Sequence, residues 1–123
     1  MSFTATPIPK PTITYAVLVG RIVEHFRKQA KMHQETMANA IGVSQSAYSR
    51  LEQGQSGMSV TQLWMIAVQL KTTPAALLHH TEQYANQLRA QGVEITSDKA
   101  ESPAGGVLIA LGILAALIAA AGS

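Results

Sequence analysis

The stretch QETMANAIGVSQSAYSRLEQG, residues 34–54, decides the fold of this chain. Its first half has an apolar stripe of helical period, formed by Met37, Ala38 and Ile41. Gly42 follows, where a helix commonly ends on a residue with positive φ, and Ser44 is a good N-cap for a second short helix. The stretch therefore predicts two short helices joined by a tight turn, which is the helix-turn-helix arrangement.

The second predicted helix has two unlike faces. One face is apolar at helical spacing and carries Ala47, Tyr48 and Leu51. The other face is polar and mostly uncharged, with side chains that can hydrogen-bond base edges: Gln45, Ser46, Ser49 and Arg50. In a helix-turn-helix the second helix is the one that enters the major groove of DNA. We therefore predict that these four residues contact bases.

The segment from Leu18 to Leu78 resembles the XRE/Cro-C1 family of phage-repressor-like DNA-binding domains. The resemblance rests on Arg27, Gln34, Met37-Ala38, Gly42-Val43-Ser44, Glu52, Gly54, Leu63, Ile66, Ala67 and Leu70. Two positions depart from the family pattern: Met58 stands where the family often has Pro, and Lys71 where it often has Gly. The resemblance implies an all-α, five-helix, lambda-repressor-like domain.

The resemblance also implies roles for individual residues. Arg27 and Glu52 are expected to form a structural salt bridge between the first and third helices. The start of the second helix and the loop after the third are expected to approach the DNA backbone, although a plain connecting loop is the alternative for the loop. The backbone contacts predicted in this way are Gln34, Ser44, Gln53, Gln55 and Ser56.

Charge and composition agree with a nucleic-acid-binding protein. Net charge is only +2, but residues 10–50 hold six basic and two acidic residues, whereas residues 82–101 hold two basic and four acidic ones. The helix-turn-helix end is therefore the basic end. There is no cysteine and no constellation of residues typical of catalysis. We expect a non-enzyme without a cofactor or a bound metal.

The chain divides into four parts. Residues 1–13, rich in Pro and Thr, predict a flexible N-terminal arm, and residues 14–92 the helix-turn-helix domain. Residues 93–104 are polar, charged and proline-containing, as is typical of a linker. Residues 105–122 predict a hydrophobic C-terminal helix.

The hydrophobic segment has no charged side chain in GGVLIALGILAALIAAAG. As a helix it would be about 27 Å long, near the thickness of the hydrocarbon core of a bilayer, about 30 Å. Because it is apolar all round, it has to be buried in protein or in lipid. We interpret it as a C-terminal transmembrane anchor that contacts membrane lipid and holds a cytoplasmic domain at the inner membrane. The alternative is an oligomerisation helix in a soluble assembly.

Two segments predict a homodimer. The fifth helix has a short seam with coiled-coil-like spacing, formed by Leu77, Thr81, Tyr84 and Leu88. The tail has small residues at four-residue intervals, Gly112, Ala116 and Ala120, which allow close packing of helices. The alternatives are that the fifth helix closes its own core and that alanine recurs here only because it is abundant.

Together these features favour a sequence-specific DNA-binding transcriptional regulator, tethered to the inner membrane and working as a homodimer on double-stranded DNA. One alternative is a protein-interaction module at the membrane, similar to the RodZ family in pairing such a domain with a membrane segment. Another is a soluble phage-type repressor with an oligomerisation tail. The third helix favours DNA, because its polar face, from Gln45 to Arg50, carries no acid.

Overall fold

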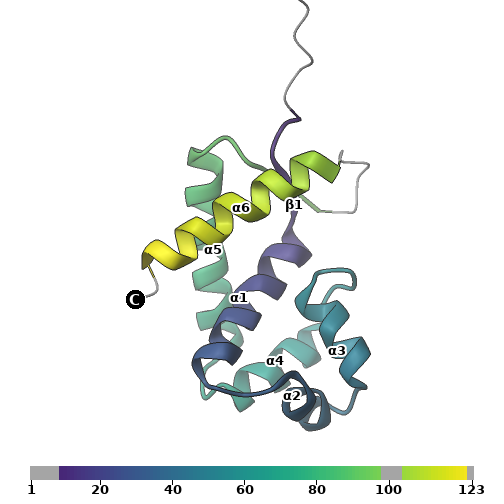
Figure 1. Ribbon diagram of the computed structural model, residues 1–123. Helices are drawn as coiled ribbons and strands as arrows, with labels where there is room; N and C mark the ends of the chain where they lie inside the picture. The colour runs from purple at the N-terminus through teal and green to yellow at the C-terminus, as the bar shows by residue number, and fades with distance from the viewer. Residues whose placement is uncertain (1–8, 98–103, 122–123) are drawn as a thin grey trace, which may run out of the picture.

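The computed structural model describes residues 9–97 and 104–121, which form six helices and two short strands (Figure 1). In chain order these are β1 (Thr12–Thr14), α1 (Tyr15–Gln29), α2 (Gln34–Ile41), α3 (Gln45–Glu52), α4 (Val60–Gln69), α5 (Pro74–Ala90), β2 (Glu94–Thr96) and α6 (Ala104–Ala121). Helices α2 and α3 lie at one end of the molecule, and α6 crosses α5 at the other (Figure 1). The two central helices α1 and α5 pack together and connect the ends.

Local capping interactions set where several helices begin. The Thr14 hydroxyl accepts a hydrogen bond from the Val17 amide at 3.1 Å, and Ser59 forms a capping box with Gln62 at the start of α4. Thr73 caps α5, whose first residue is proline. These signals are local, which is why the five helices expected between residues 14 and 92 are present.

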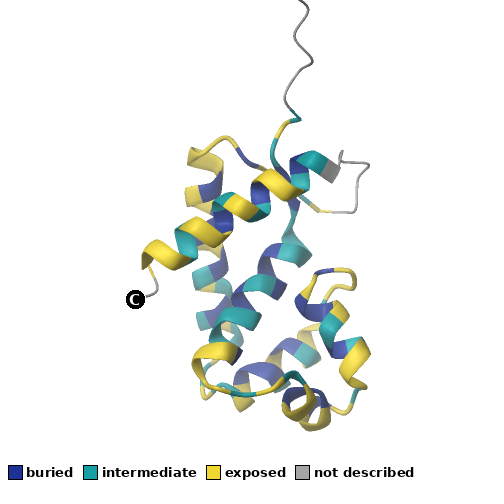
Figure 2. Ribbon diagram, in the orientation of Figure 1, coloured by how far each residue is buried: buried dark blue, intermediate teal, exposed yellow. Residues whose placement is uncertain are grey.

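Two buried clusters make up the core (Figure 2). The first lies among α1 to α5 and includes Val23, Met37, Tyr48, Leu51, Ile66 and Leu77. The second lies among β1, α1, α5 and α6 and includes Ile13, Leu18, Ile22, Leu88 and Leu114. Helix α1 contributes to both clusters, so the helix-turn-helix and the C-terminal helix are parts of one packed body.

The all-α prediction needs a small correction, because β1 and β2 form a two-stranded parallel sheet. Ile13 is fully buried and pairs with Ile95. Gly92 turns the chain after α5 with φ of 84°, and the next residue, Val93, is buried. β1 begins in the predicted arm, residues 1–13, and ends at the first residue of the predicted domain, whereas β2 lies inside the predicted linker. Residues 1–8 of the arm and 98–103 of the linker lie outside the part that the structure describes.

The transmembrane anchor predicted at residues 105–122 is wrong. In the described part of the chain, no helix is long and apolar enough to cross a membrane. Helix α6 instead packs on β1 and α5, where Ala110 and Leu114 are buried. Its first turn approaches the chain before β1 so closely that a Cβ added at Gly106 would lie 2.4 Å from the Lys10 carbonyl oxygen. One side of α6 thus covers a protein core.

Two glycines in helices test how closely the helices pack, because replacing each by alanine should change the free energy of unfolding in opposite directions. A Cβ at Gly20 in α1 would lie 2.3 Å from the Glu52 carbonyl oxygen, and that backbone cannot move without shifting α3. Gly20→Ala should therefore lower the free energy of unfolding by at least about 1–3 kcal/mol.

The matched control is Gly112→Ala in α6, where nothing lies within 4 Å of the added Cβ. It should raise the free energy of unfolding by up to about 1 kcal/mol, because alanine favours the helix over glycine. Urea unfolding followed by circular dichroism measures both changes. Equal effects of the two substitutions would contradict the close contact between α1 and α3.

Candidate nucleic-acid interface

Helix α3 is held with one face in the core and the other in solvent. Its buried residues are Tyr48, Leu51 and Glu52. Among the four predicted base contacts, Gln45, Ser46 and Arg50 are exposed, and Ser49 is half-buried. The only acid of α3 is therefore on the buried side, and the outward face is polar and free of negative charge.

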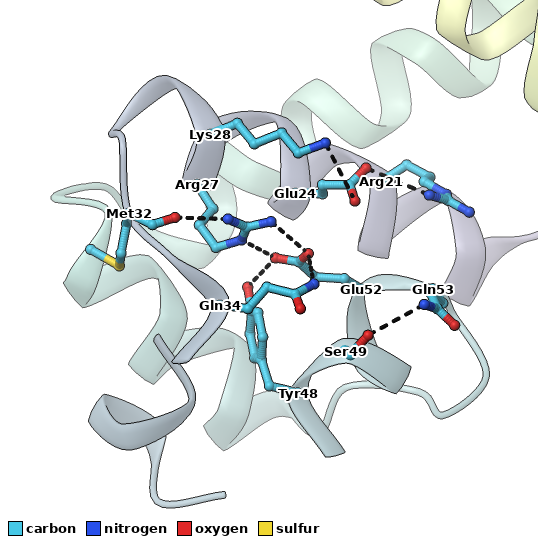
Figure 3. Close-up of polar contacts among 10 residues, drawn as sticks. All are labelled: Arg21, Glu24, Arg27, Lys28, Met32, Gln34, Tyr48, Ser49, Glu52 and Gln53. Atoms are coloured by element: carbon cyan, nitrogen blue, oxygen red, sulfur yellow. Dashed lines mark hydrogen bonds and ion pairs between the residues drawn. The ribbon is translucent and has the colours of Figure 1, made fainter. Parts of the chain in front are cut away.

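A buried ion pair ties α3 to α1 (Figure 3). The Arg27 guanidinium donates from Nε to one Glu52 carboxylate oxygen at 2.5 Å and from Nη2 to the other at 3.0 Å. It also donates from Nη1 to the Met32 carbonyl oxygen at 2.7 Å. This is the bidentate pair that the family resemblance implies between Arg27 and Glu52. Its planar geometry fixes the direction of approach as well as the distance.

Two more side chains complete the shell around the Glu52 carboxylate. The Tyr48 hydroxyl donates to it at 2.6 Å, and the Gln34 amide nitrogen donates at 2.9 Å. Burial by itself raises the pKa of Glu52, but the hydrogen bonds it accepts outweigh burial and hold the pKa below its usual value. Burial and the same carboxylate raise the pKa of Tyr48, and the hydrogen bond to Glu52 raises the pKa of Arg27. The site therefore holds a charged Glu52 at neutral pH.

Gln34 has a structural contact that the sequence analysis missed. It was predicted as a contact to the DNA backbone, yet its amide nitrogen is engaged with Glu52, and the residue is only partly exposed. The residue type of Gln34 does not reveal this contact, because the contact depends on a carboxylate 18 residues away in the sequence. Gln34 thus connects α2 to the same carboxylate that connects α1 and α3.

The loop after α3 is linked to the outward polar face of α3 by side-chain hydrogen bonds. The Gln55 amide donates to the Gln53 side-chain oxygen at 2.9 Å, and the Gln53 amide donates to the Ser49 hydroxyl at 3.3 Å. These loop glutamines and Ser56 are exposed, as is Ser44. The predicted backbone contacts of the loop therefore lie next to the predicted base contacts, on one continuous polar surface.

Ser44 also has a structural role, as the N-cap of α3 at the turn between α2 and α3. Its hydroxyl accepts a hydrogen bond from the Ala47 amide at 3.1 Å, which caps α3. Gly42 ends α2 in the left-handed region with φ of 76°, as its sequence position predicts. The turn is thus defined by local interactions.

The residues predicted for dimerisation fall into two groups. Leu77, Tyr84 and Leu88 of α5 are buried inside the protomer, so this seam packs against α1 and α6 and offers no surface. The physical reason is that α6 and β1 cover the later turns of α5. The sequence alone did not indicate a partner for these turns within the protomer. Gly112, Ala116 and Ala120 of α6 are exposed instead. The described surface retains only the second predicted dimer contact.

Residues 23–77 match the model of the helix-turn-helix family HTH_3. This segment runs from the middle of α1 to the start of α5 and contains the buried pair, the turn and α3. This segment is therefore similar to the XRE-type helix-turn-helix domains that the family model describes. No curated protein sequence matches the chain.

Solved structures share the XRE-type fold. The clp gene regulator ClgR from Corynebacterium glutamicum aligns with a TM-score of 0.60 at 24% identity, over 69% of this chain and 86% of ClgR. A second ClgR structure aligns with a TM-score of 0.54 at 23% identity, over 56% and 90% of the two chains. An HTH_3 family transcriptional regulator from Vibrio cholerae aligns at 0.50 and 20% identity, over 58% of this chain and 41% of that one. At these identities the comparison concerns the fold.

The charged state of Glu52 predicts a pH dependence of stability. Its pKa is lower in the native protein than in the unfolded chain, so the native state binds fewer protons between the two values. This contribution is complete above the unfolded pKa of about 4.3 and is lost as the pH falls through the lower native value. Glu52→Gln removes the titrating group, and its stability should depend less on pH in that window.

Urea unfolding at a series of pH values from roughly 7 down to 3 measures this dependence. Gln53→Ala, which changes no titratable group, serves as the control and should keep the slope of the wild-type protein. An equal slope for Glu52→Gln and the wild-type protein would show that Glu52 is not held charged by its neighbours.

Proposed function

We propose that this protein is a sequence-specific DNA-binding transcriptional regulator that reads the major groove with α3. The observation that carries the proposal is the outward face of α3, where Gln45, Ser46 and Arg50 are exposed while the acid Glu52 is buried. Glutamine pairs with adenine and arginine with guanine through two hydrogen bonds each, so this face has the chemistry of base readout. The similar structures, those of a clp gene regulator and of an HTH_3 family transcriptional regulator, support the same class.

The buried pair supports the proposal on physical grounds. Base readout requires side chains placed to within a fraction of an ångström by rigid elements. Arg27 and Gln34 hold Glu52, the last residue of α3, from two other helices. The loop residues Gln53 and Gln55 extend the same surface toward the positions where phosphates would lie. Phosphate contacts position the protein, and α3 supplies the specificity.

Replacement of single side chains on α3 tests base readout. Gln45→Ala should cost about 1–3 kcal/mol of discrimination at one base position of sites selected from a random DNA library. Arg50→Ala should weaken binding to a guanine or a phosphate. Gln69→Ala, an exposed glutamine at the end of α4, is the matched control and should leave binding unchanged. If Gln45→Ala and Arg50→Ala both bind the selected sites as the wild-type protein does, α3 is not the reading helix.

We further propose that the protein binds DNA as a homodimer through the exposed side of α6. One helix-turn-helix covers only a few base pairs, and two reading helices gain specificity when they lie one DNA turn apart, about 34–36 Å. The exposed side of α6 is apolar and carries Leu108, 68% exposed, beside Gly112 and Ala116. Small residues there allow a second helix to approach closely.

A single charge on this side of α6 tests the dimer. Ala116→Glu should convert a dimer into a monomer in light scattering, because it places a carboxylate in an apolar contact without a partner. A second exposed apolar strip lies on α4, with Trp64 at 57% exposure, and Trp64→Ser is the matched variant. Loss of the dimer on Trp64→Ser alone would move the contact to α4. A strict monomer in the wild-type protein, bound to one half-site, would overturn the dimer proposal.

A further inference from the structure

A groove of about 540 Å³ lies between α1 and α6, away from α3. Its two walls differ in chemistry. The α1 wall is polar and presents Arg21, Glu24, His25 and Lys28, whereas the α6 wall is aliphatic and includes Leu111 and Ile118. The groove lies outside the surface that we assign to DNA, so the proposed DNA binding does not use it.

The charges of the α1 wall are incompletely paired. One carboxylate, Glu24, serves two cations, with Arg21 Nη1 at 3.5 Å and Lys28 Nζ at 3.8 Å. Both distances are long for an ion pair with a hydrogen bond. With two cations and one carboxylate, the wall keeps a net positive charge. It can therefore accept one more anion.

Arg21 lines the groove and meets Glu24 only at a long distance, so it is the cation that can bind that anion. The Nε atom of Arg21 is buried and has no hydrogen-bond partner among the described residues. A buried N–H without an acceptor costs free energy, which a ligand recovers only if the Arg21 side chain turns to bring Nε to the groove. Since Nη1 of Arg21 meets Glu24 only at 3.5 Å and the Arg21 side chain is 32% exposed, the guanidinium can donate from its Nη groups to a second carboxylate.

The α6 wall indicates the rest of the ligand. Leu111, Leu114, Ala115, Ile118 and Ala119 form one side of α6 over about 12 Å of helix axis. None of them carries a polar group, and the small alanines leave room beside the branched residues. An unbranched alkyl chain of medium length fits along such a wall, with its head group at the charged wall.

We propose that this groove binds a fatty-acid-class monocarboxylate, whose carboxylate pairs with Arg21 and whose alkyl chain lies along α6. Lys28 contributes the second positive charge at the head group. The aliphatic chain buries apolar surface of Leu111 and Ile118 that is otherwise only partly covered. The ligand class follows from both walls together: a neutral alcohol would leave the net positive charge of the α1 wall without a counter-charge, and a small carboxylate would leave the apolar wall unused.

Titration of the full-length protein with decanoate, below its critical micelle concentration, tests the proposal. Calorimetry should show saturable binding, and NMR should show shifts of the Arg21 side-chain N–H and of the Leu111 and Ile118 methyl groups. Decanol, with the same chain and no charge, should bind at least about ten-fold more weakly, and acetate should show no saturable binding. Absence of saturable decanoate binding, or equal binding of decanoate and decanol, would overturn the proposal.

Matched variants locate the ligand. Arg21→Met should weaken decanoate binding about ten-fold or more while leaving the weak binding of decanol unchanged, and Lys28→Met should have a smaller effect of the same kind. Arg89→Met, at an exposed position on α5 outside the groove, should bind as the wild-type protein does. Circular dichroism checks that each variant is folded, and Lys28→Met carries the test if Arg21→Met does not fold.

Two neighbouring alanines on α6 separate the groove from the outer side of the helix. Ala115→Leu fills the groove and should abolish decanoate binding, whereas Ala116→Leu, on the same turn but on the side that we propose for the dimer, should leave decanoate binding unchanged whatever its effect on the oligomeric state. Both positions are exposed, so neither substitution disturbs the core. Binding that survives Ala115→Leu, or that is lost equally in both variants, would place the ligand elsewhere and overturn the proposal.

Discussion

The buried carboxylate of Glu52 is the constraint on which the arrangement of the first three helices depends. A charge in the core is tolerated only if it is paired and its lone pairs are satisfied. Here the donors come from Arg27 on α1, Gln34 on α2 and Tyr48 on α3 itself. A change in the angle between any two of these helices would break at least one of these bonds. The pair therefore specifies one geometry, whether or not it adds net stability over an apolar substitute.

This constraint explains how α3 can be short and still present a defined face. A helix of eight residues has little stability of its own and takes its orientation from tertiary contacts. Its inner side is fixed by Tyr48 and Leu51 in the core and by Glu52 in the buried pair. Gly20 contributes as well, because only a residue without a Cβ allows α1 to lie this close to the backbone at the end of α3. The outward side chains of α3 do not hold the helix in place, so they can be of any type that a ligand requires.

The sequence predicted those features of the fold that depend on neighbouring residues, such as turns and helix starts. Gly42 and Ser44 mark the turn, Thr73 and Pro74 mark the start of α5, and these features are present as expected. The parallel pairing of β1 with β2 could not be predicted, because each strand has three residues and its partner lies about 80 positions away in the chain. The amide contact of Gln34 was equally out of reach, since its residue type alone fits a phosphate as well as a carboxylate.

The error over α6 has a different origin, because its composition was interpreted correctly and its partner was not. An apolar helix must be covered, but composition does not distinguish lipid from protein as the cover. What distinguishes them is small residues at the contact: Gly106 admits the backbone near Lys10, and Ala110 is fully buried against the second core cluster. Only one side of α6 is used in this way.

The two remaining sides of α6 differ, and the difference follows from position on the helix. Leu111, Ala115 and Ile118 adjoin the charged face of α1, so their apolar surface meets Arg21 and Lys28 across a groove. Leu108 and Ala116 lie away from the core, where no described residue covers them. A helix that is apolar on every side therefore needs a contact on each side to remove its apolar surface from water. The first contact is the core of the protomer, and the other two are the aliphatic ligand and the second copy that we propose.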